Sequence, residues 1–273
     1  MKTISFTKMV GAGNDFIVID NRTNINLKKI AAAMCSRSTG IGADGLLVLD
    51  KSKTADYKMR IINSDGSEAE MCGNGARCMA AYIARTKSAK KREFSMETLA
   101  GRILAKINGK LIEVQLSDPQ KYQADISLTI NGQPIKVNYI DTGVPHTIVY
   151  VDGLKNINVE TIGKTIRWHK HFTPRGTNVD FAEQIKTDLV EVRTFERGVE
   201  GETRACGTGS VATAIVTYLT VNPHIITKNN AVMNVLTASK EILKVTFDLH
   251  NSQVTNVRLT GSATFIARGE YYV

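Results

Sequence analysis

Two short stretches, half the chain apart, decide the fold. Residues 70–75 read EMCGNG and residues 204–209 read RACGTG, and each runs into a helical pattern. In both, a Cys-Gly-x-Gly segment opens the helix, which places Cys72 and Cys206 at equivalent positions. An acidic, glycine-containing turn precedes each segment. The repetition predicts an internal duplication, with one copy of the motif in each half of the chain.

Outward from these motifs, short strand-like runs alternate with turn signals. Asn-Gly pairs at 108–109 and 131–132 are typical of hairpin turns. We expect strands at 5–8, 16–20, 45–49, 57–63, 102–107, 111–116, 135–141, 147–151, 178–183, 189–196, 243–249 and 254–260. Helical periodicity covers 26–36, 75–86, 159–168 and 209–219. The fold class predicted is α+β, rich in strands and with few helices.

The step Asp118-Pro119 is the expected seam between the halves. It predicts a first domain of residues 1–117 plus 263–273 and a second of residues 118–262, with the last strand returning to the first domain. A weaker echo pairs residues 13–16 (GNDF) with 177–181 (TNVDF).

Composition excludes several classes of protein. The chain has 273 residues, of which 22% are charged and 42% hydrophobic, so disorder and coiled coil are excluded. The net charge of +9 permits anionic partners. The basic run 87–92 (KSAKKR) is typical of a solvated loop, and no nucleic-acid recognition motif accompanies it. The sequence therefore favours no nucleic-acid partner.

The cysteines and the apolar segments of the sequence indicate in which cellular compartment the protein is expected. The four cysteines, at 35, 72, 78 and 206, are too scattered for a disulfide scaffold, and no Cys-x-x-Cys pairs suggest a zinc site. The N-terminus lacks the apolar core of a signal peptide, and residues 211–221 carry three threonines, as a buried helix would. We expect a soluble, cytoplasmic protein with reduced thiols and no metal or membrane partner.

The Cys-Gly-x-Gly motif has two chemical consequences. The positive end of a helix favours thiolate, which predicts a lowered cysteine pKa. The bare backbone N–H groups form an anion site suited to a carboxylate or phosphate. Cys35 and Cys78 lie in helical stretches among small apolar residues and are interpreted as packing residues.

If both motifs face one cleft, two helix N-termini would hold one carboxylate, and two thiols would flank the adjacent carbon. One thiolate would then remove a proton from one face while the opposed thiol supplies one to the other. No dinucleotide fingerprint, phosphate-binding loop, metal-ligand cluster or Schiff-base lysine motif occurs. The reaction predicted needs no cofactor.

On these residues the chain resembles the diaminopimelate epimerase family of PLP-independent racemases and epimerases. The resemblance covers nearly the whole chain, through residues 9–16 (MVGAGNDF), 40–45 (GIGADG), 63–68 (NSDGSE), 72–78 (CGNGARC), 143–146 (GVPH), 175–179 (RGTNV), 196–198 (ERG) and 205–209 (ACGTG). It implies interconversion of LL- and meso-diaminopimelate in lysine and peptidoglycan precursor synthesis. It also implies two similar domains, each a β-barrel-like sheet around a central helix, with the active site in the cleft between them.

The resemblance also implies roles for individual residues. Cys72 and Cys206 would be the acid–base pair, and His146 and Glu196 would assist their proton transfers. The remaining substrate-binding residues are Asn14, Asn63, Gly73, Asn74, Asn178, Arg197, Gly207 and Thr208, and Glu196 would also bind substrate. Val144 stands where the best-known members commonly have Asn, and Gly45 stands where some carry Gln, so each removes one possible amide contact from the pocket.

Three alternatives stay open. A racemase or epimerase of the same architecture could act on a different amino acid. A Cys–His hydrolase built on Cys72 and His146 would leave the second motif unexplained. A basic nucleic-acid-binding protein would explain the charge but none of the motifs. The sequence also leaves a homodimer open.

Overall fold

The computed structural model describes residues 3–20, 25–86 and 92–273, so the basic run at 87–92 lies outside the described residues except for Arg92. The chain divides into two compact units. Unit 1 comprises Met1–Gln115 and Thr260–Val273, and unit 2 comprises Leu116–Leu259. These limits lie two or three residues from the domain limits expected from the sequence.

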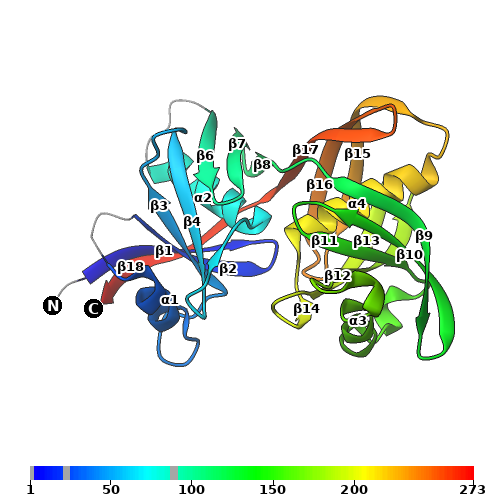
Figure 1. Cartoon of the computed structure of the whole chain (residues 1–273). Coiled ribbons are helices and arrows are strands. Elements are labelled where there is room, and N and C mark those ends of the chain that lie inside the picture. Colours follow the sequence, from blue (N-terminus) through cyan, green and yellow to red (C-terminus); the bar gives the residue numbers. More distant parts are fainter. Residues whose placement is uncertain (1–2, 21–24, 87–91) are drawn as a thin grey trace. The chain divides into compact units, whose positions relative to one another are not determined.

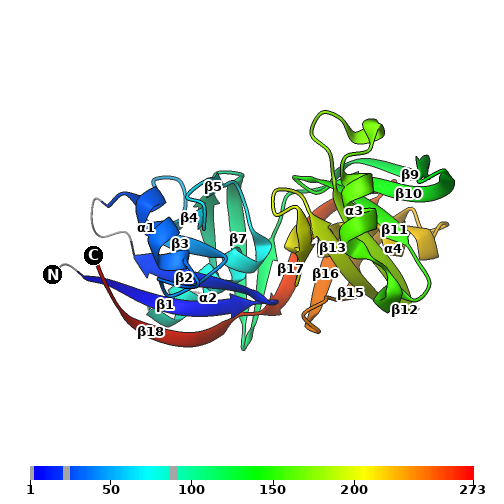
Figure 2. The same ribbon diagram turned by 90° about the horizontal axis from the view of Figure 1, so that it is seen from below.

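Unit 1 contains nine strands and two helices within the described residues (Figure 1). The strands are β1 (Thr3–Gly11), β2 (Asn14–Asp20), β3 (Gly45–Asp50), β4 (Tyr57–Asn63), β5 (Glu68–Ala69), β6 (Glu93–Thr98), β7 (Gly101–Asn108), β8 (Leu111–Gln115) and β18 (Thr264–Tyr272), and the helices are α1 (Leu27–Cys35) and α2 (Gly73–Thr86). Their pairing order is β18-β1-β2-β3-β4-β6-β7-β8, with β5 beside β4. Figure 2 shows β1 and β18 side by side, although they come from opposite ends of the chain.

Unit 2 repeats this plan. Its strands are β9 (Gln120–Ile130), β10 (Gln133–Asp141), β11 (Pro145–Tyr150), β12 (Asn178–Lys186), β13 (Leu189–Glu196), β14 (Gly201–Thr203), β15 (Thr227–Leu236), β16 (Ile242–His250) and most of β17 (Gln253–Ser262). Its helices are α3 (Val159–Arg167) and α4 (Gly207–Val221), with single 3₁₀ turns at Leu154–Asn156 and Lys170–Phe172. The order is β9-β10-β11-β12-β13-β15-β16-β17, with β14 beside β13.

The duplication extends to strand direction. In unit 1, β2 and β3 are parallel, as are β4 and β6; in unit 2, β11 and β12 are parallel, as are β13 and β15. A helix connects each parallel pair, as parallel connections require. The two-domain α+β class predicted from the sequence is therefore confirmed.

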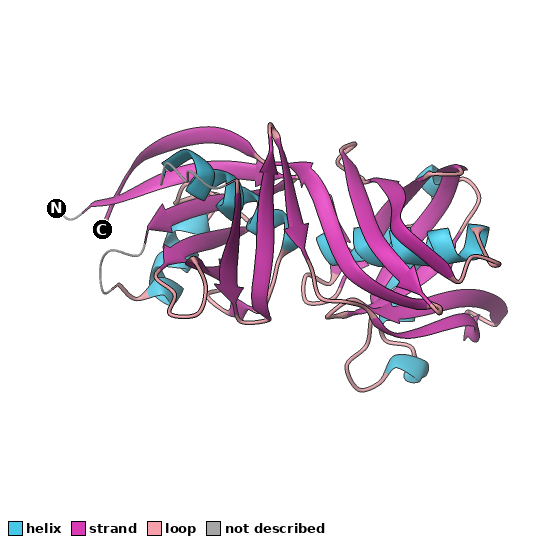
Figure 3. Ribbon diagram, turned by 90° about the horizontal axis from the view of Figure 1, so that it is seen from above, coloured by secondary structure: helices cyan, strands magenta, loops and turns pink. Residues whose placement is uncertain are grey.

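One helix is central in each unit. Helix α2 contacts β1, β2, β3, β4, β7 and β8, and α4 contacts β10, β11, β12, β13, β15 and β16. Helix α4 is buried without interruption from Gly209 to Tyr218, and α2 from Gly73 to Ala81. A helix buried on all sides needs small or apolar residues all round, and both sequences supply them. Figure 3 shows these helices lying among the strands of their own units.

The strand register corrects the weaker echo. Phe16 opposes Gly45 in the first parallel pair, and His146 opposes Asn178 in the second. The counterpart of residues 13–16 is therefore 143–146, and the pairing with 177–181 was wrong. By the same register, Val144 corresponds to Asn14, and Gly45 corresponds to Asn178. At each of these two positions, one unit therefore carries an asparagine side chain and the other unit, with Val144 or Gly45, does not.

Candidate active site

Cys206 is the N-cap residue of α4 and is 8% exposed. Its Sγ accepts a hydrogen bond from the backbone N–H of Gly209 at 3.4 Å, and lies 3.4 Å from Oγ1 of Thr208. The glycine at position 209 is required by close packing, because an added Cβ would lie 2.5 Å from Oδ1 of Asp180. The thiol is therefore held at the helix N-terminus, as the sequence predicts, beside a buried carboxylate.

The direction of the Cys206 pKa corrects the sequence prediction. Burial raises the pKa of the Cys206 thiol well above its usual value, and the Glu196 and Asp180 carboxylates raise it further. The hydrogen bonds from Thr208 and Gly209 act in the opposite direction but are outweighed. The helix N-terminus alone thus does not make this sulfur a thiolate.

His146 lies on β11, next to the N-terminus of α4, and its side chain is fully buried. Its Nδ1 lies 2.7 Å from Oδ2 of Asp180 on β12, and its Nε2 lies 3.0 Å from Oγ1 of Thr208. The other Asp180 oxygen accepts a hydrogen bond of 2.7 Å from the Thr194 hydroxyl on β13. Three neighbouring strands thus fix the imidazole beside the thiol.

Other predicted residues of unit 2 surround this cluster. The Asn178 side chain accepts from the Arg197 backbone N–H at 2.8 Å and donates to the Pro145 carbonyl at 2.9 Å. It therefore fixes the ends of β11 and β13 relative to each other. Glu196 ends β13, and one of its carboxylate oxygens accepts from the Thr203 hydroxyl at 2.9 Å. Gly207 opens α4 next to Cys206.

In unit 1, Cys72 immediately precedes α2 and is partly buried, and its Sγ accepts from the Gly75 backbone N–H at 3.4 Å. Gly73 is the first residue of the helix. The Asn74 amide donates to Oδ1 of Asn14 and accepts from Nη2 of Arg77 at 2.8 Å. These contacts anchor the amide of Asn14 to the helix N-terminus.

The remaining part of the unit 1 site is an exposed polar rim. Asn63 ends β4 and donates its side-chain amide to the Ser67 hydroxyl at 3.0 Å. The Asn14 amide donates to Oδ2 of Asp44 at 3.1 Å, and Asp44 also pairs with Arg37 at 2.7 Å. Asn14 and Asn74 thus lie together at the unit 1 motif, and Asn63 borders the turn that precedes it.

Sequence reasoning missed Asp180, Thr194 and Arg77. Asp180 and Arg77 are both completely buried. A charged residue in the middle of a strand that otherwise reads as buried is a signal that could have revealed Asp180. Arg77 stands inside the helix that the motif opens, where a charge among small residues is equally unusual.

Cys35 and Cys78 are buried, and burial raises the pKa of Cys35 to about 11. This agrees with their interpretation as packing residues. Within the described part of the chain, no group of three or more His, Cys, Asp and Glu side chains is arranged to hold a metal ion. No described helix is long and apolar enough to cross a membrane.

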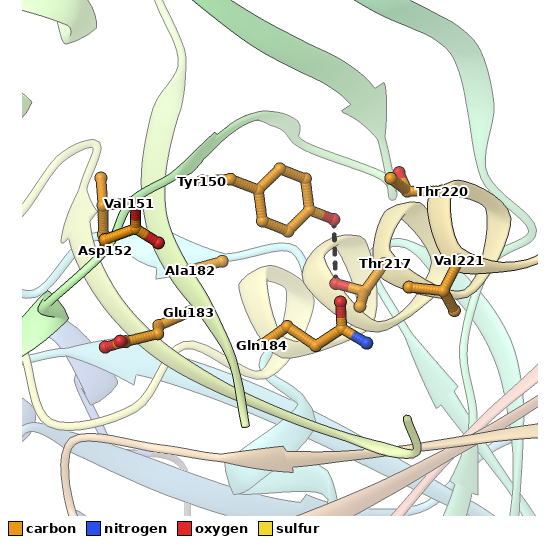
Figure 4. Close-up of a pocket in the computed structure, with 9 residues that line it drawn as sticks. All are labelled: Tyr150, Val151, Asp152, Ala182, Glu183, Gln184, Thr217, Thr220 and Val221. Atoms are coloured by element: carbon orange, nitrogen blue, oxygen red, sulfur yellow. Dashed lines mark hydrogen bonds between the residues drawn. The ribbon is translucent and has the colours of Figure 1, made fainter. Parts of the chain in front are cut away.

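A pocket of about 510 Å³ lies in unit 2 but at the opposite end of α4 from Cys206 (Figure 4). Its lining includes Thr217, Thr220 and Val221 of the last helical turns, and the Tyr150 hydroxyl lies 2.9 Å from that of Thr217. Eleven residues at about 1.5 Å each separate Thr217 from Cys206 along the helix, or roughly 17 Å. This pocket does not contain the motif.

Comparison with known structures defines the class of fold. The chain is similar to a Bacillus anthracis phenazine biosynthesis protein of the PhzF family, with a TM-score of 0.79, 17% identity and full coverage of both chains. It is also similar to a hydroxyproline epimerase from Agrobacterium vitis, with a TM-score of 0.74, 13% identity, and coverage of 98% and 92% of the two chains. At these identities the likeness concerns the fold alone.

Sequence comparison identifies the family within that class. The family model described as "Diaminopimelate epimerase" matches residues 6–122 and 138–266. The diaminopimelate epimerase of Aquifex aeolicus is 40% identical over an alignment of 280 positions, which covers 97% of this chain and 97% of the relative. That of Caldanaerobacter subterraneus is 42% identical over 232 residues, covering 78% of this chain and 84% of the relative. The chain belongs to the diaminopimelate epimerase family and is an isomerase.

Proposed function

We propose that this chain interconverts LL-2,6-diaminopimelate and meso-diaminopimelate by moving the Cα proton between two cysteines, without a cofactor. The observation that carries the proposal is the duplicated thiol at a helix N-terminus, in Cys72 and Cys206. A single motif would serve a nucleophile equally well, whereas two equivalent motifs match the two faces of one carbon. The shared name of the relatives supports the substrate.

In this mechanism the N-termini of α2 and α4 hold the reacting carboxylate. Backbone N–H groups of Gly73 and Asn74, and of Gly207 and Thr208, supply the donors. One cysteine starts as thiolate and removes the Cα proton, and the other starts as thiol and returns one to the opposite face. The roles exchange in the reverse direction.

In this proposal, His146 and Glu196 accept protons from the two cysteines and return them. Both lie in unit 2, and Glu196 is among the groups that raise the Cys206 pKa. A basic group next to a buried thiol is needed because the raised pKa otherwise keeps the proton on sulfur. Asn14, Asn63, Asn178, Glu196 and Arg197 then hold the substrate's polar groups. We place the reaction in lysine and peptidoglycan precursor synthesis in the cytoplasm.

Isotope exchange in D₂O tests the proposal. The chain is incubated with LL-diaminopimelate, and the LL and meso forms are separated and analysed by mass spectrometry. We expect meso product carrying one deuterium at Cα. Parallel incubations with proline and other amino acids test the alternative substrate. Absence of deuterium from diaminopimelate, with exchange into another amino acid, would replace this substrate while retaining the epimerase class.

A further inference from the structure

Thr208 lies between the thiol of Cys206 and the imidazole of His146. Its Oγ1 is 3.4 Å from the sulfur and 3.0 Å from Nε2 of the ring. On the far side of the ring, Nδ1 lies 2.7 Å from Oδ2 of Asp180. The four side chains therefore form an unbroken series of hydrogen-bonding contacts.

The donors and acceptors of this series take one order while the ring is neutral, and the reverse order, with Thr208 donating to sulfur, once the ring is protonated and Cys206 is a thiolate. The Asp180 carboxylate also accepts from Thr194, so it acts as acceptor toward Nδ1–H of the neutral ring. A ring protonated at Nδ1 leaves Nε2 as an acceptor, and the Thr208 hydroxyl then donates to it. The Thr208 oxygen can then still accept a hydrogen bond. The Cys206 sulfur lies 3.4 Å away, close enough for its S–H group to donate that hydrogen bond.

We propose that Thr208 relays a proton from Cys206 to His146, with Asp180 holding the ring and balancing its charge. The thiol S–H bond breaks as an O–H bond forms on Thr208, while the original Thr208 O–H bond breaks and an N–H bond forms at Nε2. The products are a thiolate and an imidazolium next to a carboxylate. No redox partner is required, and return of the proton regenerates the starting state.

The surroundings explain why such a path is needed. The charged groups that act on Cys206 are the carboxylates of Glu196 and Asp180, and the imidazole of His146 contacts Thr208 next to it. Burial and the two carboxylates oppose a negative charge on sulfur. Protonation of His146 adds a positive charge to the cluster at the moment the thiolate forms, and so offsets that penalty. Asp180 is a positioning residue for the relay, since it holds the ring of His146, and its charge also acts directly on the sulfur.

This relay rests on the proposed function only for its use in epimerisation. The proton path itself is a property of unit 2 and can be measured without substrate. Two readouts are therefore combined, the turnover of diaminopimelate and the ultraviolet absorbance of the Cys206 thiolate as a function of pH. The thiolate signal is assigned by subtracting the titration of the matching Cys206→Ser variant.

Thr208→Val removes the hydroxyl but keeps the backbone N–H that the substrate carboxylate would use. We expect kcat to fall roughly 10- to 100-fold with little change in KM. We also expect the Cys206 titration to move upward by at least about one pH unit. Thr208→Ser keeps a hydroxyl and should restore both. Thr217→Val is the matched control, since it removes a buried α4 hydroxyl that bonds Tyr150 outside the relay.

Asp180→Asn tests the far end of the path. The amide keeps the size of the side chain but cannot balance an imidazolium, so kcat should fall as in Thr208→Val. The titration of Cys206 is not the readout for this variant, because the Asp180 charge that itself raises the Cys206 pKa is lost as well. The relay is wrong if Thr208→Val titrates and turns over like Thr217→Val. If the thiol titration shifts as expected but wild-type protein exchanges no diaminopimelate, the relay stands and the proposed substrate falls.

Discussion

The two halves of this chain repeat one fold but surround their cysteines differently. The strand register places Phe16 of unit 1 at the position of His146 in unit 2, and Leu47 at the position of Asp180. An added Cβ at Gly75 would lie 3.1 Å from a methyl group of Leu47, where the same atom at Gly209 meets a carboxylate oxygen of Asp180. One thiol thus borders an apolar strand and the other a hydrogen-bonded polar cluster.

The difference extends to the residue after the first glycine of each motif. The Asn74 side chain is hydrogen-bonded to Asn14 and to the buried Arg77, whereas the Thr208 side chain is hydrogen-bonded to His146. Unit 1 therefore uses this position to fix an amide, and unit 2 uses it to contact a base. We infer that duplication supplied two equivalent sulfur positions and that later substitutions concentrated the groups able to exchange protons in unit 2.

The largest effect is expected when either sulfur is removed. Cys72→Ala and Cys206→Ala should each lower kcat by at least ~10²–10⁴, because one acid and one base are both required. Cys78→Ala is the control, since this cysteine is buried in the same helix as the unit 1 motif and has no proposed role. Near-normal turnover by either active-site variant, measured with diaminopimelate, would show that the halves do not act as a pair.

A smaller loss is expected when the proton-exchanging groups of unit 2 are changed. His146→Asn and Glu196→Gln should lower kcat strongly, by roughly 10- to 100-fold, but less than loss of a cysteine. They should also affect deuterium exchange into the LL and meso forms unequally, because both groups lie on the Cys206 side. Thermal midpoints measured beside kcat provide the control. Lost stability with unchanged kcat of the folded protein would mean that both residues are only structural.

Much of the fold could be predicted because its strongest signals are local. All four helices were expected within a few residues of their observed limits, since periodicity and motif glycines mark them. Strands β5, β6, β9, β14 and β15 were not predicted, and for β9 and β15 the burial pattern gives a physical reason. The first six residues of β9 and the first four of β15 are exposed, so the alternation of buried and less buried residues is confined to the second half of each strand.

The candidate site was likewise only partly predictable from the sequence. The thiols could be located from the sequence because their motif is contiguous, and the family resemblance supplied the remaining residues. The raised pKa of Cys206 could not be predicted, because it depends on Asp180 and Glu196, which are brought to the helix N-terminus from two other strands. The position of Cys206 at a helix N-terminus is visible in the sequence, whereas the burial of its thiol is not.

The glycines inside the two motifs test how closely each strand approaches its helix. Gly209→Ala should destabilise unit 2 by about 1–3 kcal/mol, because the new methyl group would displace a buried carboxylate that is bonded to Thr194 and His146. Gly75→Ala should cost less than about 1 kcal/mol, since a Leu47 methyl can yield and alanine favours the helix. Chemical denaturation of both variants measures the difference. Equal losses would show that the polar cluster is no more rigid than its apolar counterpart.

An effect smaller than that of Gly209→Ala concerns a charge cluster around Asp15 that has no counterpart at the corresponding position of unit 2. Asp15 lies 2.5 Å from Nζ of Lys8 and 2.8 Å from Nη2 of Arg37, and the corresponding position in unit 2 is Pro145. Burial alone would raise the Asp15 pKa, but the hydrogen bonds and charges of Arg37 and Lys8 lower it to about 2. Because the folded-state pKa lies below the unfolded value of about 4, the carboxylate adds stability above pH ~4, and that stability is lost as the pH falls toward about 2. Since Arg37 is largely exposed, solvent screening reduces the contribution to about 1 kcal/mol.

Asp15→Asn should therefore lower the free energy of unfolding by about this amount near neutral pH, and the difference in this free energy from wild type should close as the pH approaches about 2. Urea titrations of both proteins across this range measure the gap, and a gap that stays constant down to the lowest pH would show that the cluster stabilises unit 1 by packing and not by charge.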